Sequence, residues 1–139
     1  MAGLGTRTLV ITVGGTDYTA QISKTVITAN PADNDFVTFA DAANGGAREY
    51  RLEFTAVQDL VAGTIWDKVF ASAGTTAPFI LKPYGNAAAS TTQPHFTGNA
   101  IISEPDGDFI GGEADASATA RMTFEASWVL TAKPVRVTA

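Results

Sequence analysis

Apolar and polar residues alternate along several short segments of this chain of 139 residues, and this period of two constrains the fold more than any other feature. The clearest segments are residues 50–56 and 122–130, in which every second residue is apolar. Because successive side chains of a strand point to opposite faces of a sheet, these segments predict strands with one buried face. Weaker patterns predict further strands at residues 8–13, 18–22, 36–40, 78–82, 96–103 and 134–138.

The segments between the predicted strands contain one turn signal and one helix signal. Gly14 and Gly15 lie between two strand-like segments and predict a tight hairpin turn, because glycine adopts the positive φ that such turns need. Thr64 and Asp67 have the spacing of a capping box, which predicts a short helix over residues 65–73 that ends at Gly74. Loops are expected at residues 29–35, 40–46 and 85–94.

Together these elements predict a mainly β fold, an antiparallel β sandwich or barrel with one short flanking α-helix. The length fits a single domain over residues 1–139 that is large enough to bury a core. No signal peptide is recognised at the N-terminus, and no apolar segment approaches the ~20 residues that a membrane-spanning helix needs.

The charged residues are few and unevenly placed. The net charge is −5, which argues against a nucleic-acid binder held by phosphate contacts. Eight of the 14 acidic residues lie in two segments without lysine or arginine, residues 25–47 and 83–120. The simplest interpretation of these segments is two solvated acidic loops.

The sequence offers little catalytic chemistry. It has no cysteine and one histidine, His95, so a zinc site built from cysteine and histidine is excluded. His95 follows Pro94 at a predicted strand start, where a structural role is expected. We therefore assign no catalytic or cofactor-binding residue, expect no cofactor and predict that the chain is not an enzyme. The carboxylates of Glu104, Asp106 and Asp108 alternate as calcium ligands do, but Phe109 stands where a helix–loop–helix calcium loop needs glycine, so we assign no metal ligand and leave calcium open as an alternative.

The predicted strands carry few of the residues that protect sheet edges. Soluble monomers cover or charge their edge strands, often with lysine or proline. Only four lysines occur here, and many outward strand positions are threonine, alanine or serine. This composition suits pairing between copies of the chain, although edges covered by loops would explain it equally well.

The order of elements in the second half resembles a known family. The capped helix is followed by Phe79–Ile80–Leu81–Lys82–Pro83–Tyr84–Gly85, then by Pro94–His95–Phe96–Thr97–Gly98–Asn99, and finally by the alternating strand that leads to Lys133–Pro134. This arrangement resembles the major tail tube proteins of bacteriophages with long, non-contractile tails, particularly the short single-domain kind.

The resemblance implies a fold, an assembly and a set of partners. In that family six copies form a ring in which the inner strands join into one β-barrel, and rings stack into a hollow tube around a tape-measure protein, through which DNA later passes. It further implies tail terminator and baseplate proteins as partners, only transient contact with DNA and no membrane. The resemblance implies that the protein is located in the tail of the virion, and in the host cytoplasm while the tail assembles. The same fold is implied for tube proteins of contractile tails and of type VI secretion.

Two hypotheses and two alternatives accompany this resemblance. Residues 25–47 are expected to contact the next ring, and carboxylates such as Glu49, Glu53 and Glu125 are candidates to line the lumen and repel DNA phosphates. One alternative is a ligand-binding or adhesin β sandwich, with calcium at residues 104–108. The other is a different virion protein, such as a head–tail connector or a capsid decoration protein.

Overall fold

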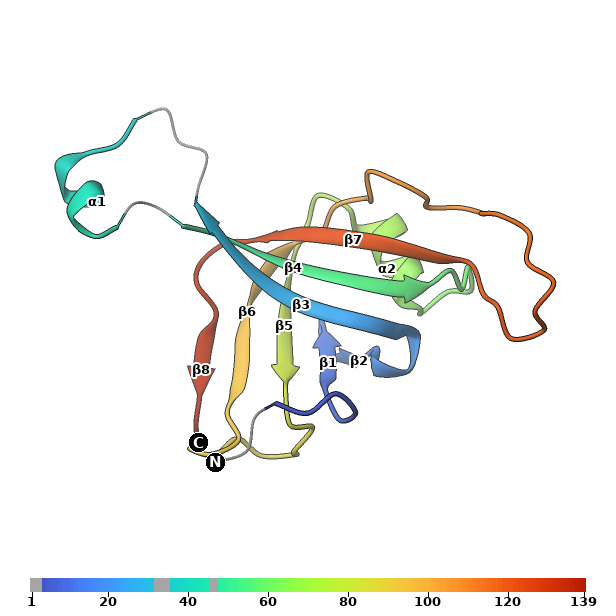
Figure 1. The fold of residues 1–139 in the computed structure, drawn as a ribbon, viewed down its shortest axis with the longest axis horizontal. Helices are drawn as coiled ribbons and strands as arrows, with labels where there is room; N and C mark the ends of the chain where they lie inside the picture. The colour runs from blue at the N-terminus through green and yellow to red at the C-terminus, as the bar shows by residue number, and fades with distance from the viewer. Residues whose placement is uncertain (1–3, 32–35, 46–47) are drawn as a thin grey trace.

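The computed structural model describes residues 4–31, 36–45 and 48–139, which form one eight-stranded antiparallel sheet with two α-helices and one 3₁₀ helix (Figure 1). This confirms the mainly β class and the short flanking helix. In chain order the elements are β1 (Val10–Val13), β2 (Thr16–Asp17), η1 (Thr19–Gln21), β3 (Ile22–Pro31), α1 (Phe39–Ala43), β4 (Arg48–Val57), α2 (Ile65–Ser72), β5 (Thr76–Lys82), β6 (His95–Ile101), β7 (Thr123–Leu130) and β8 (Val135–Val137).

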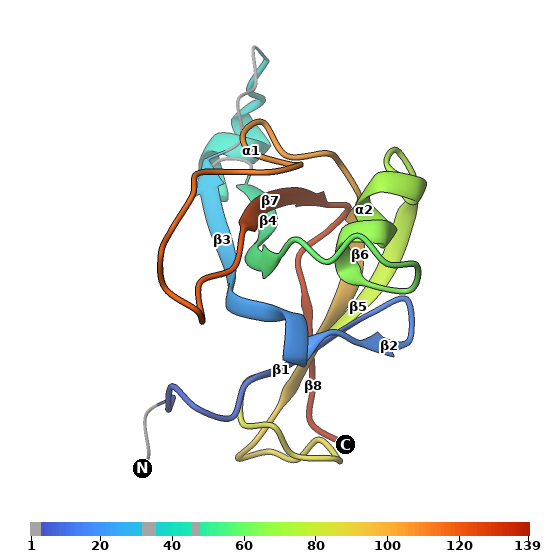
Figure 2. The same ribbon diagram turned by 90° about the vertical axis from the view of Figure 1, so that its right-hand side faces the viewer.

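The sheet folds over on itself so that its two halves face each other. The strand order is β2-β1-β5-β6-β7-β4-β3, and β8 pairs with β6. Strands β3, β4 and β7 cross steeply over β1, β5, β6 and β8 (Figures 1 and 2). The corner lies where β6 pairs with β7, through Ala100 opposite Leu130 and Ile101 opposite Val129. This arrangement is an orthogonal packing of two sheet halves joined at a corner.

One apolar core lies between the two halves and α2. Alternate residues of β4 and β7 point into it, as the period of two predicts, and the aromatic rings of Phe54 and Trp128 meet edge to face at 4.9 Å. Phe79 adds a fully buried ring from β5 in the opposite half. The alternation also predicts Met122 on the buried face, but β7 begins at Thr123 and Met122 is 44% exposed.

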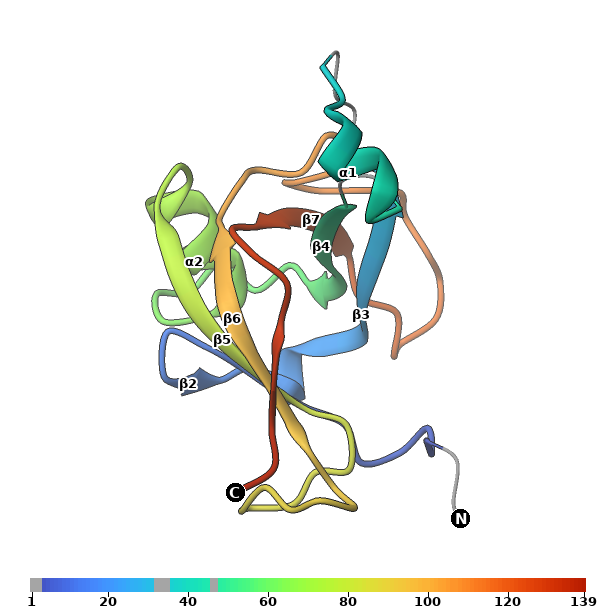
Figure 3. The ribbon, with the colours of Figure 1, turned by 90° about the vertical axis from the view of Figure 1, so that its left-hand side faces the viewer.

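The predicted helix is confirmed as α2, which covers one side of the core (Figure 3). The Thr64 hydroxyl accepts a hydrogen bond from the Asp67 backbone N–H at 3.2 Å, as an N-cap does. The Asp67 carboxylate, however, accepts from the Gly63 N–H at 3.1 Å. A reciprocal capping box needs the N–H of Thr64, the N-cap residue, so the predicted second bond of the box forms one residue earlier in the chain. Gly74 follows the helix with φ +90°, as predicted.

The hairpin at Gly14 and Gly15 is confirmed, but the strand expected at residues 18–22 is a turn of 3₁₀ helix. The Asp17 carboxylate accepts from the Thr19 N–H at 2.8 Å, and the Thr19 hydroxyl accepts from the Ile11 N–H at 3.1 Å. These local bonds bend the chain before β3 begins at Ile22. Hydrogen bonds from the Thr19 side chain and backbone also hold the pKa of Asp17 below its usual value.

The first long loop was predicted wrongly at both ends. Residues 29–31 of the loop expected over residues 29–35 belong to β3, and residues 40–43 of the loop expected over residues 40–46 belong to α1. The strand expected at residues 36–40 does not form, because Thr38 and Asp41 make a reciprocal capping box that starts α1. Residues 32–35 and 46–47 lie outside the described residues. The loop over residues 85–94 is present as expected.

A glycine substitution tests how the β5–β6 loop is fixed against the N-terminal segment. Gly85 has φ +71°, and a Cβ atom there would lie inside van der Waals contact with the Thr8 carbonyl oxygen. Gly85→Ala should therefore cost about 2 kcal/mol or more and lower the Tm by about 6 °C or more, measured by thermal unfolding. Gly5→Ala is the matched control, since a Cβ atom there meets no neighbour within 4 Å. Equal melting of the two variants would contradict this account.

Candidate assembly site: an open sheet edge beside a polar trough

Strand β3 ends the sheet, and its ten residues form a long open edge. Within the described residues it pairs only with β4, in a ladder that runs from Ile22 opposite Ala56 to Pro31 opposite Arg48. The backbone groups on its other side therefore have no strand partner there. Lys24 and Pro31 lie near the two ends, but the six residues from Thr25 to Asn30 contain no charge and no proline. Such an edge is a template for pairing with another chain.

The other ends of the sheet are short. Strand β2 has two residues and β8 has three. Pro134 directly precedes β8, and Arg136 places a charge at its centre. Short edges with proline or charge are the usual protection against edge-to-edge pairing. The contrast singles out β3 as the edge at which another chain can dock.

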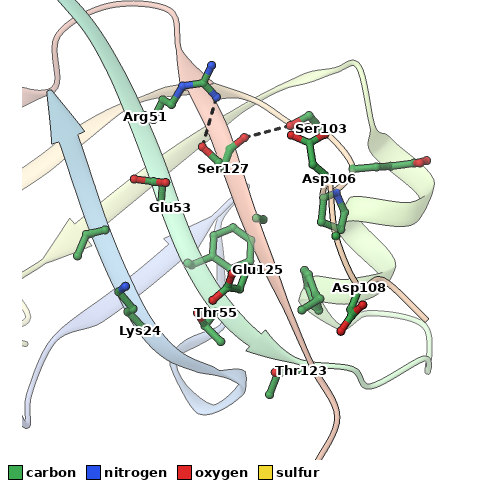
Figure 4. Close-up of a pocket in the computed structure, with 17 residues that line it drawn as sticks. Lys24, Arg51, Glu53, Thr55, Ser103, Asp106, Asp108, Thr123, Glu125 and Ser127 are labelled. Carbon is green, nitrogen blue, oxygen red and sulfur yellow. Dashed lines mark hydrogen bonds between the residues drawn. The ribbon is translucent and has the colours of Figure 1, made fainter. Parts of the chain in front are cut away.

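A polar trough of about 920 Å³ lies beside this edge, on the face of β3, β4 and β7 that points away from the core (Figure 4). Its floor is formed by alternate side chains of β4 and β7, and the segment of residues 103–108, here called the strap, forms one wall. Figure 4 shows the labelled strap residues lying along β7 on the side away from β4. The labelled lining residues are Lys24, Arg51, Glu53, Thr55, Ser103, Asp106, Asp108, Thr123, Glu125 and Ser127.

The trough is predominantly acidic. Five carboxylates line it, together with only Lys24 and Arg51 as basic groups. The Arg51 guanidinium lies 3.1 Å from the Glu49 carboxylate and donates to the Ser127 hydroxyl at 3.3 Å, so one of the two bases is already paired. The five carboxylates are those of Glu53, Glu104, Asp106, Asp108 and Glu125.

The structure brings together the three acidic residues expected to share a surface. Glu49 and Glu53 alternate on β4, and Glu53 lies opposite Ser127 of β7, two residues from Glu125. All three therefore point to the same face of the sheet. Sequence reasoning did not identify Lys24 as part of this face, because Lys24 lies on β3, where no strand was predicted over residues 23–31. Arg51 alternates with Glu53 on a predicted strand, so the period of two places it on this face.

The carboxylates of the strap do not form a cation site in the structure. In the part of the chain that is described, no group of three or more acidic or histidine side chains is arranged to hold a metal ion. Glu104, Asp106 and Asp108 are instead spread along the trough wall (Figure 4).

A second exposed feature lies at the far end of the molecule, where α1 projects beyond the β3–β4 ladder (Figure 1). The side chain of Phe39 on α1 is 96% exposed, and that of Val37 just before it is 60% exposed. Two large apolar side chains on a projecting element are unusual unless a partner covers them. We call residues 36–45 the arm.

His95, the only histidine, is buried at the start of β6, and its Nε2 lies 3.0 Å from the Asn86 carbonyl oxygen. This contact links the β5–β6 loop to the start of β6, which is a structural role.

Comparison with protein-family models, curated proteins and solved structures finds no match to this chain. None of the helices among the described residues is long and apolar enough to cross a membrane.

The dispersed strap carboxylates predict a result for calcium. Added calcium at about 10 mM, tenfold above the Kd of weak calcium modules, should leave the Tm unchanged. A calcium site with a Kd one tenth of the added concentration would raise the free energy of unfolding by about 1.4 kcal/mol, and the Tm would rise by several degrees. Thermal unfolding with calcium, with magnesium and with chelator checks this, and a shift specific to calcium would favour the ligand-binding alternative.

Proposed function

We propose that this chain is a structural subunit that pairs with copies of itself through β3, forms closed rings, and stacks these rings into a hollow tube like those of long-tailed bacteriophages. The observation that carries the proposal is the open edge of β3, ten residues long and uncharged from Thr25 to Asn30. The proposal assigns no catalytic role to the chain.

Pairing through β3 explains why such an edge is tolerated. An edge strand that is paired in the assembly no longer exposes its N–H and C=O groups, so it needs no protection by charge or proline. A contact between two different surfaces of identical subunits closes into a ring when the rotation between them closes. A ring of this kind, with six subunits as the tail tube resemblance implies, leaves no free β3 edge.

The acidic trough supports placing one face of the sheet toward the lumen of the ring, namely the face of β3, β4 and β7 that points away from the core. Because the face carries Glu49, Glu53 and Glu125, a lumen lined by β3, β4 and β7 would repel the phosphates of passing DNA. Basic side chains at these positions would bind phosphates and release counterions, which would hold DNA in place. The same lumen would enclose a tape-measure protein during assembly in the host cytoplasm, with terminator and baseplate proteins at the ends of the finished virion tail.

The arm supports stacking between rings. It projects from one end of the molecule, away from the core, and presents Phe39 and Val37 to solvent. Covering these side chains by the adjacent ring would bury apolar surface at about 25 cal/mol per Å². The arm lies within residues 25–47, the segment expected from the sequence to make this contact.

Val26→Lys tests the edge. Val26 lies on β3 opposite Glu53, so a lysine there gains an oppositely charged cross-strand neighbour and the monomer should stay folded. A charge in the middle of the edge should prevent the approach of a second strand. We expect the wild-type protein to form filaments with a central hole in negative-stain images, spontaneously or from seeds, and Val26→Lys to form none.

The matched control for this experiment is Val135→Lys, which places the same charge on another exposed edge strand, β8. It should assemble like the wild type. Filaments from Val26→Lys, or concentrated wild-type protein that stays monomeric even with seeds, would contradict the proposed function. A small closed oligomer without filaments would favour a connector or decoration protein.

Phe39→Ser tests stacking separately from ring formation. Because Phe39 is 96% exposed, the change removes almost no buried surface and the Tm should stay within about 1 °C of the wild type. Rings should form, but tubes should be absent or much shorter in electron micrographs. Leu60→Ser, at a 54% exposed position away from the arm, is the control and should give tubes of normal length. Normal tubes from Phe39→Ser would show that the arm is not the stacking element.

A further inference from the structure

A ring closed by strand pairing needs two open edges on every subunit, and β3 supplies only one. The second must accept the β3 of a neighbour, so it has to be long enough to form a ladder. Strands β2 and β8, with two and three residues, are too short for this. The remaining candidate within the described residues is the side of β7 that faces away from β4.

Most of that side of β7 is free of strand partners. Strand β6 pairs with β7 only at Val129 and Leu130, the last two residues of β7. The six residues from Thr123 to Trp128 pair with β4 on one side and, across the described chain, with no strand on the other. Among the described strands, only β3 has a longer stretch without a strand partner on one side.

The strap occupies this side of β7 in the isolated molecule. The Ser103 hydroxyl donates to the Ser127 carbonyl oxygen at 3.2 Å (Figure 4). In addition, Trp128 Nε1–H donates to the Ser103 carbonyl oxygen at 3.2 Å. Two backbone acceptors on this side are therefore taken by side chains, because the Thr123 carbonyl oxygen, four residues from that of Ser127, accepts from Gln58 Nε2–H at 2.8 Å. A loop with charge and proline laid along a strand is a known way to cover an edge.

The strap is held firmly at its ends and loosely between them. Before it, Ile102 is buried and donates its N–H to the Thr75 carbonyl oxygen at 2.8 Å. After it, the Phe109 carbonyl oxygen accepts from Trp66 Nε1–H at 2.9 Å, and the Phe109 ring packs on Phe124. Within the described residues, none of residues 104–108 makes a hydrogen bond. The middle of the strap can therefore move away from β7 without unfolding its anchors.

The direction of the strands fits a β3 strand at this position, and so does one pair of charges. Once the strap has moved aside, β7 itself presents Glu125, which is opposite in charge to Lys24, the one charged residue of β3. Strands β3 and β7 both run antiparallel to β4, so they run in the same direction. Rotation about a ring axis preserves the sense in which a strand runs along that axis, so in a ring whose strands run along the axis β3 of one copy would pair in parallel with β7 of the next.

We propose that β7, beneath the strap, is the acceptor edge for β3 of a second copy, and that the strap is a guard that must move aside before this pair forms. The inference rests on the proposed self-assembly and specifies which two edges meet. It also explains how a chain with an open β3 edge can remain monomeric: its own acceptor edge is covered until a growing end displaces the strap.

Paired cysteines test which edges meet, in a chain that has no cysteine of its own. Val26→Cys on β3 is combined in turn with Thr123→Cys, Glu125→Cys or Ser127→Cys on β7, all on the same face of the sheet. Because β4 separates these strands by two spacings, roughly 10 Å, a disulfide cannot form within one molecule. Oxidation of assembled protein should give a ladder of covalent oligomers on non-reducing gels for at least one pair.

Two controls test whether β3 pairs with β8 or with another copy of β3 instead of β7. Val26→Cys with Val135→Cys pairs β3 with β8 and should give no ladder. Val26→Cys alone should give no dimer, whereas antiparallel pairing of two β3 strands about a two-fold axis would give one. A ladder through β8, or dimers from the single variant, would overturn the β7 assignment while leaving assembly through β3 intact. Wild-type protein that never assembles would overturn both.

Ser103→Ala tests the guard itself. The change removes the hydroxyl that occupies the Ser127 carbonyl oxygen at an exposed position, so the fold should be unaffected. Loss of one such bond should shorten the lag before spontaneous filament growth by roughly two- to tenfold, measured by light scattering. Ser103→Thr keeps the hydroxyl and should retain the wild-type lag. An unchanged lag for Ser103→Ala would overturn the guard, whatever the cysteine pairs show.

Discussion

The backbone hydrogen bonds that β3 leaves unmade are the constraint on which the rest of this structure depends. A strand at the end of a sheet can satisfy only half of its N–H and C=O groups from its neighbour, and here ten residues are in that position. The composition of β3, with threonine, valine and isoleucine in its central part, favours a second strand over solvent.

The core makes this edge rigid enough to act as a binding surface. Leu52 and Phe54 of β4 and Trp128 of β7 are almost completely buried, so the two strands behind β3 are fixed in register. A slip of one residue would turn these side chains to the polar trough, which makes the register strongly specified. The edge is therefore presented by a fixed framework, and pairing with a second copy requires little ordering of β3 itself.

The edge and the arm point to two different contacts. Strand β3 can extend the sheet sideways, whereas α1 projects beyond the end of the β3–β4 ladder. A subunit with one lateral contact and one axial contact builds a tube, with rings closed by the first and stacked by the second. In the proposed tube, the acidic trough is the surface that three strands of every subunit contribute in common. The open edge, the arm and the trough are the surface features on which the proposed structural role rests.

Local signals in the sequence determined the elements whose stabilising contacts are near in the chain. The alternation in β4 and β7, the glycine hairpin after β1 and the Thr64 cap of α2 were all predictable, because each depends on a strand period or on groups a few residues apart. The loop predicted over residues 29–35 was wrong at its start, because residues 29–31 belong to β3, which is a strand only through its ladder with β4. The candidate site was predictable only in part: the acidic side chains and the shortage of edge protection could be read from the sequence. The tertiary structure decided which edge stays open, and it placed Lys24 and Glu125 on the same face as Arg51 and Glu53. Both results follow from pairings between strands that are distant in the chain.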